Sequence, residues 1–166
     1  MGCDIHVYPE YALFEKEGGG THWSPLASEC HPGRDYDLFS KLAGLRGDEG
    51  NQMIPTRGMP DDAAYESKSA NELYIVDGPT DNEGYCTREQ AESWIEYGSR
   101  YTDERKLFVT HPDHHSHSWC TAAEFRAVLE ASRKWAIDEP YWGLLAMLEE
   151  IERRGKATRL VFWFDN

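Results

Sequence analysis

Alternating apolar and polar side chains at the start of the chain predict a β-strand over residues 3–15. The two-residue period places three side chains on each face, Cys3, Ile5 and Val7 on one and Asp4, His6 and Tyr8 on the other. A run of three glycines at residues 18–20 then predicts a turn, and residues 21–26 are expected to return as the partner strand of a hairpin.

A continuous apolar and aromatic run over residues 159–164 predicts another strand near the end of the sequence. Because both faces of this run are apolar, it is typical of a central strand that is covered on both sides. We expect it to lie next to the first strand, and that arrangement would place Asp165 close to Asp4 or His6.

Helical spacing of apolar side chains and two capping boxes predict helices between these strands. Thr87 with Gln90, and Thr121 with Glu124, have the spacing in which a hydroxyl and a side chain three residues later bond reciprocally to backbone N–H groups. The expected helices cover residues 36–45, 88–97, 122–135 and 140–154.

Strands at both ends with helices between them predict an α+β fold. We expect a single domain, residues 1–166, in which the N-terminal hairpin and the C-terminal strand form a small mixed or antiparallel sheet packed by three to four helices. Short strands are expected at residues 72–76 and 106–110. Residues 47–71 are rich in Gly, Pro, Asp and Ser and are expected to form a long loop, and such loops are often functional.

Charge narrows the classes of partner. The chain carries 30 acidic and 17 basic residues, a formal net charge of −13. This balance argues against nonspecific nucleic-acid binding and against docking on anionic lipid, since both need clustered cations. A small anion is not excluded, because a few local Arg side chains can hold one. No apolar run approaches the roughly 20 residues of a membrane span, and we expect no membrane partner, reduced thiols and a cytoplasmic location.

The strongest chemical signal is a histidine cluster, because four of the seven histidines fall within residues 111–117. In an extended backbone His115 and His117 would point the same way, with Asp113 on that side. Two imidazoles and a carboxylate suit a metal site, and two imidazoles also suit metal-free acid–base catalysis. The structural alternative is an exposed polar loop whose Ser118 or Thr121 caps the following helix.

Further candidates lie at the chain ends and around the first helix. Asp4 and His6 share a strand face that could equally be a solvated surface. The catalytic candidates are His6, His115 and His117. The metal-ligand candidates, for Zn, Mn or Mg if any cofactor is used, are Asp4, His6, Asp113, His115, His117 and Asp165. The substrate-binding candidates are Arg34, Arg46, Tyr36 and Trp119, for which surface ion pairing and core packing are the structural alternatives.

Several blocks of the sequence resemble a family of small proteins encoded by tailed bacteriophages. They include the opening MGCDIH, the block HSHSW and the closing VFWFDN, and the full set covers residues 1–6, 34–39, 42–46, 57–60, 115–119 and 161–166. The resemblance includes both ends, and these blocks make up about a fifth of the chain. The resemblance implies expression in the cytoplasm of an infected bacterium, but it implies no particular enzymatic reaction.

These observations favour an enzyme that hydrolyses a phosphoester, or a related bond, of a small nucleotide-like molecule with a His/Asp site, with or without a divalent metal. One alternative is a binding protein that sequesters a small nucleotide signal without turnover, as in phage counter-defence. Another is an acidic inhibitor that imitates nucleic acid toward a host protein. The sequence leaves a homo-oligomer open.

Overall fold

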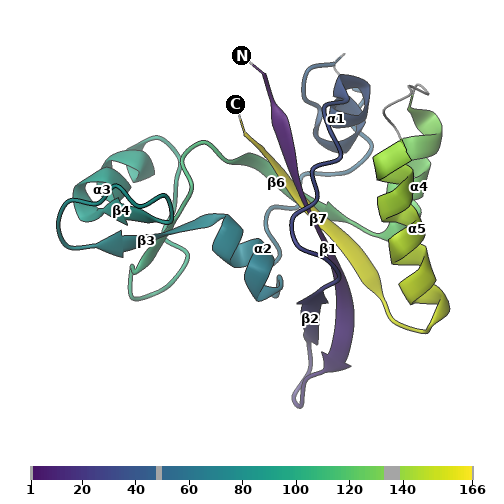
Figure 1. Cartoon of the computed structure of the whole chain (residues 1–166), viewed down its shortest axis with the longest axis horizontal. Coiled ribbons are helices and arrows are strands. Elements are labelled where there is room, and N and C mark those ends of the chain that lie inside the picture. The colour runs from purple at the N-terminus through teal and green to yellow at the C-terminus, as the bar shows by residue number, and fades with distance from the viewer. Residues whose placement is uncertain (1, 48–49, 133–138, 166) are drawn as a thin grey trace.

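The computed structural model describes residues 2–47, 50–132 and 139–165, and it has an α+β fold built on two sheets (Figure 1). The larger sheet is antiparallel, with the order β2-β1-β7-β6. Its strands are β1 (Asp4–Glu15), β2 (Thr21–Pro25), β6 (His115–Cys120) and β7 (Thr158–Asp165). The predicted hairpin is therefore confirmed, as is the central position of the C-terminal strand beside the first strand.

A smaller sheet forms a separate unit, at the end of the molecule opposite to α4 and α5 in Figure 1. Its order is β4-β3-β5, from β3 (Glu72–Val76), β4 (Tyr85–Thr87) and β5 (Phe108–Thr110), and α3 (Arg88–Glu96) follows β4. Thr87 and Gln90 make the predicted capping box. The unit has its own buried cluster, made of Leu73, Ile75, Cys86, Ala91 and Val109.

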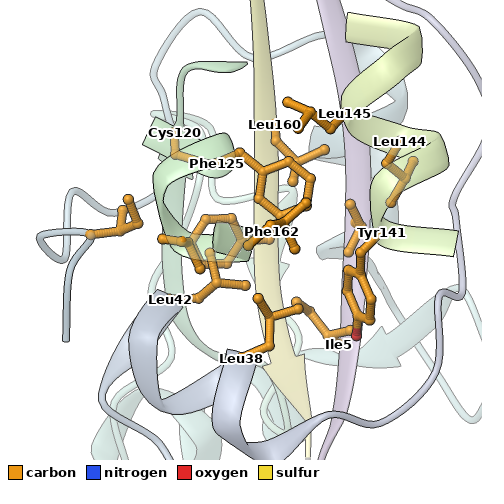
Figure 2. Close-up of a cluster of buried hydrophobic side chains, with 14 of the residues drawn as sticks. Ile5, Leu38, Leu42, Cys120, Phe125, Tyr141, Leu144, Leu145, Leu160 and Phe162 are labelled. Atoms are coloured by element: carbon orange, nitrogen blue, oxygen red, sulfur yellow. The ribbon is translucent and has the colours of Figure 1, made fainter. Parts of the chain in front are cut away.

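Three helices bury one face of the larger sheet. They are α1 (Tyr36–Ala43), α4 (Ala122–Ala131) and α5 (Glu139–Arg153). Phe162 of β7 points into this core with Ile5 of β1, among leucines and aromatic rings from the helices (Figure 2), and Phe164 belongs to the same buried cluster. Burying each such side chain stabilises the fold by roughly 1.5–3 kcal/mol. None of the described helices is long and apolar enough to cross a membrane.

The predicted loop at residues 47–71 is wrong at its end, where α2 (Tyr65–Ala70) forms. This helix has a single buried side chain, Ser67, so it lacks the apolar periodicity from which a helix is predicted. Two other boundaries also shift. The predicted strand at 106–110 begins only at Phe108, and α4 ends at Ala131, while the rest of the helix predicted to residue 135 lies mostly outside the described residues.

A buried ion pair ties α2 and the preceding loop to the larger sheet. Glu10 on β1 is 0% exposed and Arg159 on β7 is 5% exposed, and 2.8 Å separates Glu10 Oε2 from Arg159 Nε. The other carboxylate oxygen accepts hydrogen bonds from the Ala64 N–H at 2.8 Å and the Ser67 hydroxyl at 2.5 Å. Arg159 also pairs with Asp62 at 2.8 Å. A buried carboxylate therefore fixes the path of residues 62–67.

Removing the Glu10 carboxylate should lower the free energy of unfolding much more than removing an exposed carboxylate. We expect Glu10→Ala to lower the free energy of unfolding by about 3–5 kcal/mol, because it leaves the Arg159 guanidinium buried without this partner. The control is Glu149→Ala, which breaks the more exposed pair with Arg126 and should cost less than about 1 kcal/mol. Urea denaturation measures both, and equal midpoints for the two variants would contradict a structural role for Glu10.

Candidate functional site

The face of β7 that points away from the helices carries a cluster of histidines around Trp163. The Trp163 side chain is 0% exposed, and its ring lies 5.7 Å from that of His6, 5.6 Å from that of His114 and 5.9 Å from that of His117. His111 stacks on His114 with ring centroids 4.3 Å apart. We call His6, His111, His114 and His117 the histidine cluster. The Trp163 indole N–H is buried without a hydrogen-bond partner among the described residues.

Asn71 orients two members of the cluster. It follows α2, and its side-chain oxygen lies 3.1 Å from His114 Nδ1 and 2.7 Å from His117 Nε2. An amide oxygen only accepts hydrogen bonds, so each histidine carries its proton on the nitrogen that faces Asn71. The other nitrogens, His114 Nε2 and His117 Nδ1, then present lone pairs. Neither has a hydrogen-bond partner within residues 2–47, 50–132 and 139–165.

Burial keeps three of these imidazoles neutral near pH 7. It lowers the pKa of His117 to about 4, with the Arg100 guanidinium as the next contribution. Burial also lowers the pKa of His114 to about 3, with neighbouring histidines adding to the shift, and it lowers the pKa of His111. The two lone pairs are therefore available at neutral pH to accept a proton or bind a ligand.

These histidines line a pocket of about 430 Å³ beside the smaller unit, which we call the histidine pocket. His111, His114, His115 and His117 all line it, together with Tyr97 and Arg100, which follow α3. Arg100 is exposed, and within the described residues no acidic side chain forms an ion pair with its guanidinium. An unpaired guanidinium beside neutral imidazoles is suited to hold an anionic group.

His6 belongs to the cluster but not to the wall of this pocket. Its Nδ1 makes a short hydrogen bond with the Glu29 carboxylate, and its Nε2 lies 3.2 Å from Asp165 Oδ2, out of line for a hydrogen bond. The Asp4 N–H donates to the other Asp165 oxygen at 3.1 Å. The predicted proximity of Asp165 to Asp4 and His6 is therefore confirmed. Burial, together with Glu29, raises the pKa of Tyr8.

The prediction that His115 and His117 point the same way is wrong. The pairing of β6 with β7 shifts between His115 and Ser118, and Ser116 has a positive φ of 54°. Two residues therefore stand opposite one, as in a β-bulge. The His115 ring faces Phe164 at 6.4 Å, whereas the His117 ring faces Trp163, so the two lie on different faces of β7. His115 Nε2 is buried there without a hydrogen-bond partner among the described residues.

The predicted metal-ligand set is not brought together. Asp113 is exposed, and Asp4 forms a two-pronged pair with Arg34. His117 bonds to Asn71, and the bulge separates it from His115. Across the part of the chain that the structure describes, no three His, Cys, Asp or Glu side chains are grouped so as to hold a metal ion.

The predicted substrate-binding residues lie outside the histidine pocket. Arg34 is held by Asp4. Arg46 lies near Cys3, where burial raises the pKa of the thiol against the opposing charge of Arg46. The Tyr36 ring packs edge-on against Phe39, and Trp119 lies 4.5 Å beneath the Arg57 guanidinium. The sequence did not predict three residues of the site, Asn71, Tyr97 and Arg100. Their local sequence contains no functional motif, and only the packing of the smaller unit brings them to the histidines.

Comparison with known proteins adds no relative: no family model, curated protein or solved structure matches the chain. The chemistry of the site therefore rests on its geometry alone.

The lowered histidine pKa values should make the protein less stable as the pH falls. The unfolded chain protonates histidine near pH 6.5, whereas the folded protein keeps His117 neutral down to about pH 4. Between these values stability is lost by at most about 1.4 kcal/mol per pH unit for one histidine, and by less where the ring is partly solvated. Below about pH 4 this contribution is exhausted.

We expect His117→Gln to show a shallower loss of unfolding free energy between pH 6.5 and 4 than the wild type. Urea denaturation at several pH values measures this slope. The control is Asn51→Gln, at an exposed position without a titratable side chain, and it should keep the wild-type slope. An unchanged slope in His117→Gln would show that this imidazole does not titrate in the way described.

Proposed function

We propose that the histidine pocket binds a small nucleotide-like molecule and hydrolyses a phosphoester bond in it, as an accessory activity of a bacteriophage in the host cytoplasm. The observation that carries the proposal is the arrangement around Asn71. Its side-chain oxygen sets the tautomers of His114 and His117, and both histidines line a pocket that Arg100 also lines. A base and an anion-binding group are thus combined in one cavity.

The reaction needs only these groups and water. Arg100 would pair with two oxygens of the phosphoryl group and offset the charge that develops on them. One of the free nitrogens, on His114 or His117, would take a proton from a water molecule as its oxygen forms a bond to phosphorus. The bond from phosphorus to the alcohol oxygen then breaks, and the imidazolium returns the proton to that oxygen. One ester and one water yield an alcohol and a phosphate.

A divalent metal fits this site only in part. The free nitrogens of His114 and His117 are suitable ligands for Zn or Mn. The third ligand expected of such a site is not found among the described residues. The step above is therefore derived from imidazole as the base, and none is derived through a metal.

The second candidate function is sequestration of the same class of ligand without turnover. The low pKa values of His111, His114 and His117 favour it, because they leave no imidazolium in the resting pocket to protonate a leaving group. Such a protein would serve a phage by withdrawing a nucleotide signal. The pocket and Arg100 would bind in the same way in both cases.

Substitutions of the pocket residues should affect ligand binding and turnover differently. We expect Arg100→Ala to weaken the binding of nucleoside phosphates about 10- to 100-fold, because it removes charge-assisted hydrogen bonds. His114→Gln and His117→Gln should bind but lose turnover, by about 100-fold or more for the one that acts as the base. Calorimetry measures binding, and chromatographic separation of substrate and product measures turnover, over a panel of cyclic and linear nucleotides, with Mn²⁺ or with EDTA.

The matched control is Arg105→Ala, which removes one exposed positive charge from the smaller unit outside the pocket. It should leave binding and turnover unchanged. Turnover that is absent in the wild type, or equal in the wild type and both histidine variants, would remove the hydrolase. Recovery of intact nucleotide after denaturing a preformed complex would then support sequestration, and an equal loss of binding in both Arg variants would contradict either function.

A further inference from the structure

A second pocket adjoins the histidine pocket and shares two of its residues. This cavity, of about 300 Å³, is lined by Arg100 and Thr110, which also line the histidine pocket, and by Asn71, whose side chain holds the histidines. Arg100 therefore stands at the boundary between the two. A ligand whose anionic group lies on Arg100 has room to extend in either direction.

The chemistry of the second pocket is opposite to that of the first. Two acidic side chains, Asp61 and Glu72, line it together with the cationic Lys68 and Arg100, and we call it the acidic pocket after its carboxylates. Glu72 is the first residue of β3, opposite Thr110 on β5, and is only partly exposed. Burial raises its pKa, against the opposing effects of a hydrogen bond from Thr102 and the charge of Lys68. The Lys68 ammonium itself is bound to the Asp61 backbone carbonyl, which leaves the Asp61 carboxylate without an ion pair among the described side chains.

Carboxylates at this position do not suit a second phosphate, because like charges repel at short range. They suit N–H donors, since an ionised carboxylate only accepts hydrogen bonds and can accept two side by side. Tyr101, another lining residue, offers an aromatic ring that a base can contact, and the Lys106 ammonium lies 5.0 Å from the centroid of this ring. The pocket thus combines an aromatic ring with carboxylate acceptors in a cavity that Arg100 also lines.

We propose that the acidic pocket binds the nucleobase of the ligand and that Glu72 selects guanine. Guanine presents two adjacent N–H donors, from its ring nitrogen and its amino group, and these match the two oxygens of one carboxylate. Uracil offers carbonyl oxygens at its edge on both sides of a single N–H, and these would face the carboxylates without a donor. The inference rests on the proposed function, in that the phosphate of the same molecule lies on Arg100.

The test compares guanosine and uridine 5′-monophosphates by calorimetry on the whole protein. We expect the wild type to bind the guanine nucleotide at least about tenfold more tightly than the uracil nucleotide. Glu72→Gln should lose most of this preference, because the amide keeps only one acceptor oxygen for guanine and offers the uracil carbonyls an N–H donor. Asp61→Asn provides a second variant at the same pocket, should Glu72→Gln disturb the folding of the smaller unit.

The control is Glu104→Gln, an exposed acid of the smaller unit that lines neither pocket, and it should keep the wild-type preference. Equal affinity for the two nucleotides in the wild type, or a preference that survives in Glu72→Gln, would overturn the selection of guanine by Glu72. If Arg100→Ala still weakens both nucleotides equally in that case, the phosphate site stands. If neither nucleotide binds, both the proposed function and this inference are contradicted.

Discussion

The two-sided burial of β7 is the constraint on which the rest of this structure depends. Its strand period sends Phe162 and Phe164 into the helical core and Trp163 into the histidine cluster. The antiparallel pairing of β7 with β1 on one side and β6 on the other fixes this assignment. A slip of one residue would exchange the faces, removing two phenylalanines from the core and the indole from beneath the histidines. Core and site are thus specified by one register.

A second chain of contacts connects stability to the site. The buried Glu10 carboxylate, held by Arg159, binds the backbone at Ala64 and the Ser67 hydroxyl, and so places α2 against the sheet. Asn71 follows α2 directly, and its side chain sets the tautomers of two histidines. A buried ion pair adds little stability over apolar packing, but it does specify position. Here it positions the residue that orients the candidate base.

The sequence predicted those parts of the fold whose signals are local. The strand period of β1 and β7, the triglycine turn and the two capping boxes each act within a few residues, and all are confirmed. The failures arise where distant segments decide. The bulge at Ser116 follows from the pairing of β6 with β7, so the side chain of His115 could not be assigned from spacing. Asn71 and Arg100 join the site only through the docking of the smaller unit, and no local pattern records that.

The charge of Arg100 also connects the fold to the site. In a chain with 30 acidic residues, arginines such as Arg34, Arg57 and Arg159 find carboxylate partners. Arg100 instead shares the histidine pocket with imidazoles that burial keeps neutral. Imidazolium rings there would repel the guanidinium, and ionised carboxylates within ion-pair range would neutralise it. Burial of the histidines therefore has two effects. It keeps the imidazole lone pairs unprotonated, and it leaves the Arg100 guanidinium available to bind an anion.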